Sequence, residues 1–546
     1  MRNKLLFLIV LCCAYLLNAQ NTIGTLTNEE GVLNGYTLFT SQTETYLIDN
    51  CGQVINQWSS SYPPGNAVYL LENGNLLRAA KTDNPDINFG GRGGRIELFN
   101  WEGTLIWEYD YSSSDESQHH DIYPMPNGNV LMLAVTVMDS NEAIMAGRNP
   151  ANLSQNELYN EQILELEPVG TNSANIVWEW NVKDHLIQDF DNTKANFGIV
   201  EDNPQLLDIN YIGGSNGNAN WMHVNSIQYN IQLDQIVMSS RLLNEFYIID
   251  HSTTTIEASG STGGLRGKGG DFLYRWGNPQ AYKRGTANDQ QLFGQHFPYF
   301  IPDGLTDAGK IILYNNGFGR TPRFSEVFLL DLPTESEGVY SYTSGTSYGP
   351  SVPEYIYSDP VDPTNFYSAI LSSALRLPNG NTLICDGDSG YFFEIDVNEN
   401  IVWEYVNPVG NTQILTQGDD PLGSGNTSFR ALKYAVDYPA FIGRDLTPGN
   451  PIELNPDLSN CDLLSVNEFS IKSSMRTYPN PVTTNLFIDS EKMIESISVY
   501  NLLGKKVIDG LGNIKTIDFT NLADGLYIVK LVTSDDILTT KKVIKN

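Results

Sequence analysis

Short alternations of apolar and polar residues, broken by turn residues, run along most of the chain, and long apolar repeats with a 3.6-residue period are missing. A period of two is typical of half-buried β-strands, because successive side chains point to opposite faces of a sheet. Gly, Asn, Tyr and Thr are abundant, as expected for many short strands joined by turns. The pattern predicts an all-β protein.

One turn recurs with almost the same sequence. Residues 71–77 read LENGNLL, residues 125–131 read MPNGNVL, and residues 377–383 read LPNGNTL. Asn-Gly favours a type I′ turn, so each copy predicts a hairpin tip that leads into an apolar strand. An aromatic segment recurs between the turns, with Trp107, Trp178, Trp276 and Trp403 near its centre.

A turn, two strands and an aromatic strand make the pattern of one four-stranded blade, repeated here at roughly 55–75 residues. We therefore expect residues 20–448 to form a six-bladed β-propeller. A sandwich of stacked hairpins would contain similar turns, but it rarely repeats the same aromatic motif.

The first residues have the pattern of a secretory signal peptide. A basic start, Met1–Lys4, precedes an apolar run over residues 5–17 and a small residue, Ala19. The run is shorter than the ~20 apolar residues of a membrane span, and no other stretch approaches that length. We expect residues 1–19 to be a signal peptide and the protein to be exported through the periplasm without a permanent membrane span. A buried N-terminal helix is the alternative.

A change of composition separates the end of the chain from the rest. Residues 449–474 are rich in Pro, Asn and Ser without a period and predict a linker. In residues 475–546, strands predicted at 485–489, 495–500 and 525–531 indicate a small β-sandwich. Tyr478-Pro479-Asn480-Pro481 and Asp524-Gly525-Leu526-Tyr527 resemble motifs of the C-terminal sorting domain of the type IX secretion system. The resemblance implies that the tail engages that machinery and is then removed, so the protein is secreted or stays at the cell surface. A carbohydrate-binding or spacer module is the alternative.

Charge and cysteine content restrict the function classes. The chain has a net charge of −32, and the two ends contribute +2 each, so residues 20–471 carry −36. Such a surface repels nucleic acid, and it accepts an anionic small molecule only at a local cationic pocket. Beyond the signal peptide three cysteines remain, too few for all to pair within the chain. Cys51 and Cys461 lie near the two ends of the main region and can bridge it, whereas Cys385 is expected to be a buried thiol.

Only six histidines occur in the chain, and four of them stand beside predicted strands. His185 and His251 lie in polar stretches and are expected at the surface. His223 and Asn225 are two apart, so on a strand they share one face, and Arg241 ends the next strand. The inner strands of a propeller converge on a channel, so histidines from separate blades can meet there. The candidates are His119, His120, His223, Asn225, Arg241 and His296.

Together these segments resemble the bacterial arylsulfotransferases, which are periplasmic or secreted six-bladed propellers. The resemblance covers roughly residues 30–445 and rests on 119–121 (HHD), 223–226 (HVNS), 239–241 (SSR) and 295–296 (QH). It implies that His296 is the nucleophile that becomes sulfated. It also implies that His223, Arg241, Asn225 and one of His119 and His120, with His120 favoured, surround the transferred group. Some family members carry a disulfide between two nearby cysteines, and no such pair occurs here.

The chemistry is coherent for a ping-pong transfer from a phenolic sulfate ester to a phenol. Neutral imidazole is a nucleophile near pH 7, an arginine holds sulfate oxygens, and a second histidine exchanges protons with the two phenols. No Walker-type loop is present, which disfavours a nucleotide sulfate donor, and no cofactor is expected. Zinc held by His120, His223 and His296 is a weaker alternative, because a dication would repel Arg241. A non-catalytic surface propeller that binds glycans or proteins is the second candidate function. We expect the substrate pocket to be walled by long segments such as 139–160 and 335–365.

Overall fold

A computed structural model describes residues 21–462, 476–490, 493–501, 505–512, 514–533 and 538–546, and the expected signal peptide lies outside these ranges. The chain divides into two compact units, Met1–Cys461 and Asp462–Asn546. Both units are built from antiparallel sheets, so the all-β prediction is confirmed. None of the helices within the described ranges is long and apolar enough to cross a bilayer.

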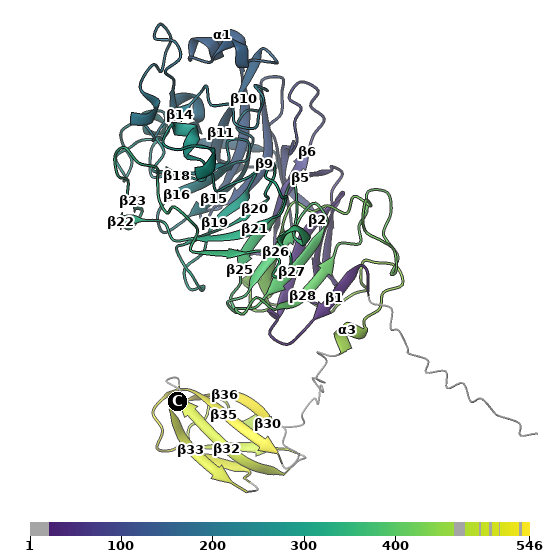
Figure 1. The fold of residues 1–546 in the computed structure, drawn as a ribbon. Helices are drawn as coiled ribbons and strands as arrows, with labels where there is room; N and C mark the ends of the chain where they lie inside the picture. The colour runs from purple at the N-terminus through teal and green to yellow at the C-terminus, as the bar shows by residue number, and fades with distance from the viewer. Residues whose placement is uncertain (1–20, 463–475, 491–492, 502–504, 513, 534–537) are drawn as a thin grey trace, which may run out of the picture. The chain divides into compact units, whose positions relative to one another are not determined.

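Six antiparallel sheets make up most of the first unit (Figure 1). The first sheet contains β29 (Ala431–Ala435), β2 (Gly35–Ser41), β3 (Glu44–Ile48) and β4 (Val54–Ser59). The second contains β5 (Pro64–Leu70), β6 (Leu76–Lys81), β7 (Gly94–Phe99) and β8 (Leu105–Asp110). The third contains β9 (Glu116–Pro124), β10 (Val130–Asp139), β11 (Glu157–Val169) and β12 (Ser173–Asn181). The next two are β15 (Val224–Asn230), β16 (Gln235–Ser240), β17 (Glu245–Asp250) and β18 (Tyr274–Trp276); and β19 (His296–Phe300), β20 (Ile311–Asn315), β21 (Glu326–Leu330) and β24 (Tyr355–Tyr357). The sixth is β25 (Ser373–Arg376), β26 (Thr382–Asp386), β27 (Tyr391–Ile395), β28 (Ile401–Val406) and β1 (Gly24–Asn28).

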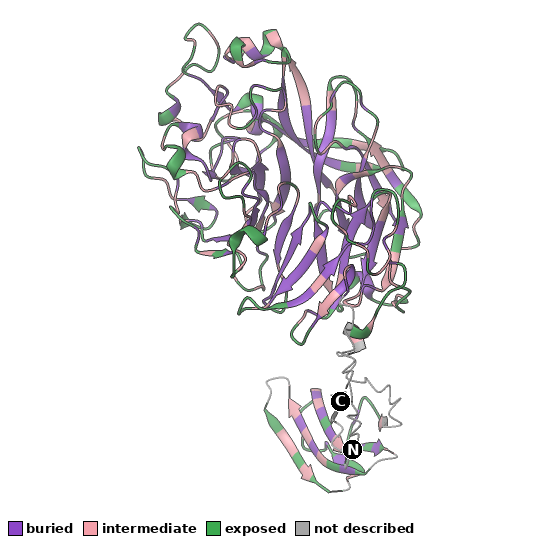
Figure 2. Cartoon of the chain, turned by 45° about the vertical axis from the view of Figure 1, so that its right-hand side comes forward, coloured by how far each residue is buried: buried purple, intermediate pink, exposed green. Residues whose placement is uncertain are grey.

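Short elements lie between the strands of these sheets or after the last strand. They are two small strand pairs, β13 (Leu186–Ile187) with β14 (Leu207–Asp208) and β22 (Thr334–Ser336) with β23 (Val339–Tyr340), and the helices α1 (Ser140–Met145), α2 (Thr255–Ala258) and α3 (Ser459–Asp462). Buried residues are concentrated on the strands of the six sheets, while exposed ones gather in the connections (Figure 2).

The sheets follow one another in a ring of contacts. β2 contacts β5, β5 contacts β9, β9 contacts β15, β15 contacts β19, β19 contacts β25, and β26 contacts β29. The strand β29, from the end of the unit, lies in the same sheet as β2 from its beginning, and β1 pairs with β28. Chain segments from both ends of the unit are therefore joined by backbone hydrogen bonds.

Tryptophans connect five of the six sheets to the next one. The indole N–H of Trp107 donates to the Ser173 carbonyl at 2.9 Å, and that of Trp403 donates to the Asn50 carbonyl at 2.8 Å. Trp58, Trp178 and Trp276 make equivalent bonds to Asn100, Thr253 and Pro350. A buried indole needs an acceptor, so the same residue recurs wherever one sheet must be attached to its neighbour.

The Asn-Gly repeats form hairpins as predicted, but the predicted turn type is wrong. At the first repeat the Gly74 N–H donates to the Leu71 carbonyl, the Leu71 N–H donates to the Asn75 carbonyl, and Gly74 has φ +84°. A type I′ turn requires positive φ at both central residues, but the φ angle of Asn73 is not positive. The loop is instead a three-residue connection in which a type I turn ends at a left-handed glycine. The repeats at 125–131 and 377–383 have the same hydrogen bonds.

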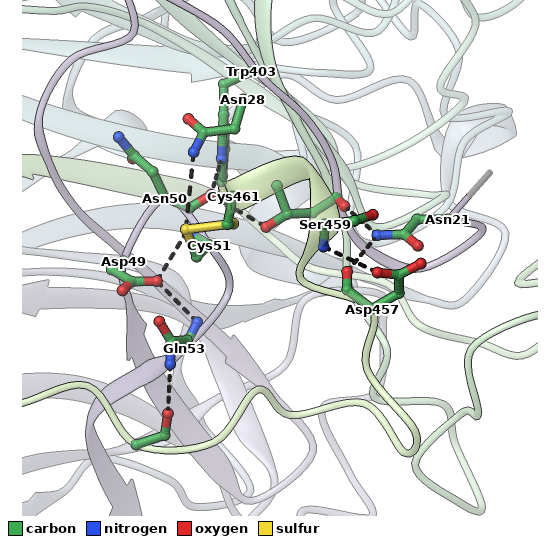
Figure 3. The surroundings of a disulfide bond; sticks show 12 residues. Asn21, Asn28, Asp49, Asn50, Cys51, Gln53, Trp403, Asp457, Ser459 and Cys461 are labelled. Carbon is green, nitrogen blue, oxygen red and sulfur yellow. Dashed lines mark hydrogen bonds between the residues drawn. A yellow bond between two sulfur atoms is a disulfide. The ribbon is translucent and has the colours of Figure 1, made fainter. Parts of the chain in front are cut away.

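A disulfide joins Cys51 to Cys461 across 410 residues of sequence, with the Cα atoms 5.7 Å apart (Figure 3). The Asn21 amide donates to the Asp457 carbonyl beside it. The first part of the expected linker, residues 449–461, thus belongs to the first unit, and residues 463–475 are outside the described ranges. Cys385 is a fully buried free thiol, as expected.

The second unit consists of two antiparallel sheets around one apolar core. One contains β30 (Arg476–Tyr478), β31 (Asn485–Asp489) and β34 (Thr516–Asp518), and the other contains β33 (Lys506–Leu511), β32 (Ile494–Asn501), β35 (Gly525–Thr533) and β36 (Leu538–Lys545). The buried side chains Leu486, Val499, Val529 and Val543 belong to this core. The three strands predicted here are all present.

Candidate active site

The candidate residues lie on strands of three neighbouring sheets or directly beside them. His119 and His120 lie on β9, His223 immediately precedes β15, and His296 is the first residue of β19. Arg241 directly follows β16, and its N–H donates to the His223 carbonyl at 3.1 Å. A backbone hydrogen bond thus joins His223 and Arg241 at the open end of the hairpin.

Each of these inner strands is irregular at the candidate residues. The register of β9 skips residues 119–121, that of β15 skips Asn225, and that of β19 skips Phe297 and Pro298. His120, His223 and Phe297 have φ near +50°, a left-handed conformation that costs a non-glycine residue about 1–2 kcal/mol. Bulges and strained backbone of this kind redirect side chains, and they gather at functional sites.

The imidazoles of His120 and His223 are in contact, with ring centroids 4.7 Å apart. Phe89 packs against both rings, and Gly91 lies against the His120 ring. A Cβ atom at Gly91 would lie 1.9 Å from His120 Nε2, and Gly91 has φ +84°. The glycine-rich segment 89–94 therefore closes one side of the site, and residue 91 must be glycine for this approach.

His296 is held in one orientation by Asn316. The Asn316 amide nitrogen donates to the carbonyls of Ser368 and Leu371 at 2.9 and 3.1 Å, so its oxygen faces His296 Nδ1 at 2.8 Å. An amide oxygen can only accept, so Nδ1 of His296 carries the hydrogen. In the neutral ring the lone pair is then on Nε2.

Arg241 is a half-buried cation without a carboxylate partner among the described residues. Its guanidinium lies 4.6 Å from the ring centre of Phe318 and makes one long hydrogen bond, 3.4 Å, to the Ala369 carbonyl. Burial lowers its pKa, and an arginine remains charged nevertheless. Most of the fully buried arginines, such as Arg275 and Arg430, are paired with carboxylates.

Burial and the Arg241 charge keep the three site histidines neutral. Burial and, after it, the Arg241 charge together lower the pKa of His296 to about 3. The pKa values of His120 and His223 are lowered well below their usual value, mainly by burial and then by neighbouring imidazoles and Arg241. Arg241 contributes to the lowered pKa of all three histidines, so its guanidinium lies near all three rings. Neutral imidazole, the nucleophilic form, is present at pH 7.

Asn225 is fully buried beside His296. Its amide nitrogen donates to the Gln295 carbonyl at 2.8 Å, and its oxygen has no hydrogen-bond partner. One N–H of the amide is therefore committed to holding Gln295, the residue before His296.

His119 presents no free nitrogen to a ligand. Its Nε2 lies 3.0 Å from a carboxylate oxygen of Glu161, and its Nδ1 lies 2.9 Å from Nδ1 of His120. His120 was favoured over His119 from the sequence as the residue at the transferred group, and its Nε2 has no such partner. Contact of His119 with substrate stays a prediction that this hydrogen bonding disfavours.

The two histidines expected at the surface are not there. His185 is fully buried, stacked on Trp180, and bonded to Asp271 at 2.9 Å. His251 lies between Asp234 and Glu165 at 2.7 and 3.0 Å, and these carboxylates raise its pKa to about 9. Their partners are far away in sequence, so polar neighbours along the chain gave the wrong prediction.

A buried ion pair lies behind the site. Arg430 pairs with Asp121 at 2.9 Å, and its guanidinium lies 3.8 Å from the ring centre of Phe297. Asp121 also accepts from the backbone N–H of Ile227. This pair joins the sheets that carry β29, β9 and β15 and supports the backbone next to His120 and His296.

A cavity of about 360 Å³ opens beside His223. Its lining is uncharged and rich in carboxamides: Asn88, Phe89, Gln155, Tyr159, Asn218, Asn220, His223 and Leu242. The Asn220 oxygen is buried without a partner. Gln155 and Tyr159 belong to the expected wall segment 139–160, whereas residues 335–365 do not line the cavity.

Sequence reasoning missed Glu161, Asn316, Arg430 and the 89–94 loop. Asn316 and Glu161 act through histidines that lie 20 and 42 residues away, so no local motif includes them. Gly90-Gly91 and Gly93-Gly94 in the loop were visible signals of close backbone approach. Within the part of the chain that the structure describes, no three His, Cys, Asp or Glu side chains are arranged to hold a metal ion.

Two family models match the chain. The model described as Arylsulfotransferase (ASST) matches residues 18–416, and the one described as Secretion system C-terminal sorting domain matches residues 476–546. No curated protein matches the chain. Solved structures similar to it include a protein of unknown function from Bacteroides caccae, 10% identical, covering 73% of this chain and 98% of its own, with a TM-score of 0.38. Another is the periplasmic gluconolactonase of Pseudomonas aeruginosa, 9% identical, covering 68% and 96%, with a TM-score of 0.33. Because these TM-scores are low, the structures carry no argument about reaction or substrate.

Proposed function

The chain belongs to the arylsulfotransferase family, and from this premise we propose that it moves a sulfuryl group from a phenolic sulfate ester to a phenol through a sulfohistidine on His296. One observation carries the proposal. His296 offers a lone pair on Nε2, with Nδ1–H held by Asn316, beside a half-buried arginine that has no carboxylate partner among the described residues.

In the first half-reaction Nε2 of His296 attacks sulfur in line with the aryl oxygen. The S–N bond forms, the S–O bond breaks, and the aryl oxygen leaves with the electron pair as phenolate. Arg241 neutralises charge on the non-bridging oxygens, as cationic groups do in phosphoryl transfer. The sulfated ring is cationic and keeps Nδ1–H, so its bond to the Asn316 oxygen becomes charge-assisted and stronger.

In the second half-reaction an acceptor phenol occupies the place of the departed phenolate. Its oxygen attacks sulfur, the S–N bond breaks, and the electron pair returns to Nε2 of His296. The hydroxyl proton passes to a neutral imidazole, for which His120 is our choice because its Nε2 has no hydrogen bond to a described residue. His223 and Asn225 bound the same space and contact the transferred group.

The uncharged cavity beside His223 suits an aryl group. Its size, about 360 Å³, lies within the ~300–1,000 Å³ range of small-molecule pockets. Phe89 and Tyr159 supply an aromatic wall, and carboxamides supply hydrogen bonds. A phenol with neutral polar substituents fits this lining better than one with a carboxylate, which would lose hydration without gaining a charged partner.

The finer architecture is part of the proposal. Six consecutive sheets that contact one another in a ring support a six-bladed propeller, with the site where inner strands approach one another. Two sheets around one core support a small sandwich for the tail. Since the tail matches a secretion sorting domain, we infer export by the type IX machinery to the outside of the cell.

The test is burst kinetics with p-nitrophenyl sulfate on the full mature chain. Without acceptor, we expect one equivalent of p-nitrophenol per active site, followed by turnover when phenol is added. His296→Ala should lose both phases, whereas the matched variant His251→Gln, at a histidine outside the site, should keep them.

Two results would count against this function. Normal activity of His296→Ala would remove the nucleophile assignment. Absence of any release by the wild-type chain across a panel of aryl sulfates would favour the non-catalytic binding propeller instead.

A further inference from the structure

Glu161, His119 and His120 form a continuous chain of hydrogen bonds in the interior. Glu161 lies on β11 and is 1% exposed, and His119 is fully buried. One Glu161 oxygen lies 3.0 Å from His119 Nε2, and the other accepts from the Val224 backbone N–H at 2.9 Å. The chain continues from His119 Nδ1 to His120 Nδ1 at 2.9 Å.

The direction of these bonds follows from the donors available. An ionised carboxylate only accepts, so His119 Nε2 must carry the hydrogen. A neutral imidazole has a single N–H, so His119 Nδ1 accepts and His120 Nδ1 donates to it. His120 is thereby left with its lone pair on Nε2, the nitrogen that lies against Gly91 at the site.

We propose that Glu161 and His119 are positioning residues that hold His120 in the tautomer able to take the proton of the acceptor phenol. This rests on the proposed sulfuryl transfer and goes beyond it, because it gives His119 a role behind the site rather than in contact with substrate. The carboxylate of a Ser-His-Asp triad holds its imidazole in one tautomer in the same way.

The acceptor phenol gives its proton to His120 as it attacks sulfur. Its O–H bond breaks, the proton binds His120 Nε2, and the phenol oxygen forms its bond to sulfur. The imidazolium of His120 keeps its Nδ1–H bond to His119, whose own N–H is held by the Glu161 charge. The proton is then lost to water.

The carboxylate linked to the His120 side chain by hydrogen bonds is Glu161, through His119. The groups that face His120 from neighbouring elements are cationic, neutral or aromatic: His119, His223, His296, Arg241, Phe89 and Phe429. Asp121, the next residue in sequence, is already paired with Arg430. Glu161 is therefore the charge that can compensate a protonated His120.

Glu161→Gln reverses the direction of the hydrogen bonds from residue 161 to His120 without changing their geometry. The Val224 N–H requires an oxygen opposite it, so the Gln amide nitrogen faces His119 Nε2 and donates to it. His119 then carries its hydrogen on Nδ1 and donates to His120 Nδ1. His120 is left with Nε2–H and can no longer accept a proton at the site.

The variant should separate the two half-reactions. We expect an unchanged p-nitrophenol burst, because His296 is untouched, and acceptor turnover lowered ~100-fold or more for phenol. Acceptors with more acidic hydroxyls already carry a phenolate and need no base, so their turnover should fall much less. The control Glu165→Gln removes another buried carboxylate of β11 that accepts from a histidine, His251, and should keep both phases.

A second measurement tests the chain independently of catalysis. With only six histidines, ¹⁵N spectra of the labelled full chain at pH 8 resolve which ring nitrogens are protonated. We expect hydrogen on Nδ1 of His120 in the wild type and on Nε2 in Glu161→Gln. This readout holds even if no aryl sulfate is turned over, so failure of the proposed function is distinguishable from failure of this inference.

Three outcomes would overturn the inference. They are hydrogen on Nε2 of His120 in the wild type, an equal loss of burst and turnover in Glu161→Gln, and a loss of turnover that does not depend on the acidity of the acceptor.

Discussion

The ion triad around His251 makes a quantitative prediction about stability and pH. Glu165 belongs to β11 of one sheet, and Asp234 lies in the turn before β16 of the next, so His251 joins two sheets through bonds of 3.0 and 2.7 Å. Burial opposes its charge, but the two carboxylates prevail and raise its pKa to about 9. The same contacts lower the pKa of Glu165 to about 2.

The sign and size follow from linkage. A histidine pKa raised from 6.5 to about 9 in the folded state stabilises that state by about 3 kcal/mol, fully present below pH 6.5 and lost as pH rises through 9. The contribution is about 2 kcal/mol at pH 7.5 and close to zero by about pH 10.

The assay is urea unfolding of the wild type and His251→Gln at several pH values from 6 to 10. We expect the difference in free energy of unfolding to shrink by about 2–3 kcal/mol over that range. Subtracting the variant removes the other groups that titrate. A difference that stays constant with pH would refute the reasoning, because it would mean that His251 has the same pKa in both states.

Other predictions concern the site. Gly91→Ala should abolish acceptor turnover, since its Cβ would lie 1.9 Å from His120 Nε2, whereas Gly128→Ala, with similar φ and open space around it, should cost stability only. Arg241→Lys should weaken donor binding ~10–100-fold, measured from the donor dependence of the burst, because a lysine lacks the bidentate fork. An unchanged burst would deny Arg241 contact with the sulfate. Acceptors of equal hydroxyl acidity should differ by at least ~10-fold in kcat/KM, with neutral hydroxylated phenols above carboxylate-bearing ones. Equal values would show that the cavity does not bind the acceptor.

The repeats predicted the sheets because each repeat performs the same structural task. The turn at Gly74 and its copies starts a strand, and the following tryptophans, such as Trp107 and Trp403, attach one sheet to the next through an indole hydrogen bond. Such tasks recur in most of the sheets and therefore leave a periodic pattern. The dihedral angles inside the turn leave no such pattern, since Asn-Gly suits both a type I′ turn and a type I turn closed by a left-handed glycine.

The histidines show where reading along the chain fails. His185 and His251 have polar neighbours in sequence, but each is bonded to a carboxylate 86 residues away. Burial of a polar side chain depends on such partners, which only the fold brings together. His120 and His223 do approach one another as predicted, because His120 lies on β9, His223 directly precedes β15, and these two strands are in contact.

The backbone conformation at the site differs from the one that these residue types prefer. This explains why the sequence alone did not assign a role to each histidine. His120, His223 and Phe297 adopt positive φ angles that no propensity rule would assign to them, each within an irregular stretch of an inner strand. Strain of this kind persists only where the surrounding structure enforces it, here through the buried pair of Arg430 with Asp121 and the bond of Asn316 to His296. The resemblance selected His296 as nucleophile among several histidines. The hydrogen bonds supply a separate physical reason, since they leave its Nε2 lone pair free and give His120 the matching tautomer of a base.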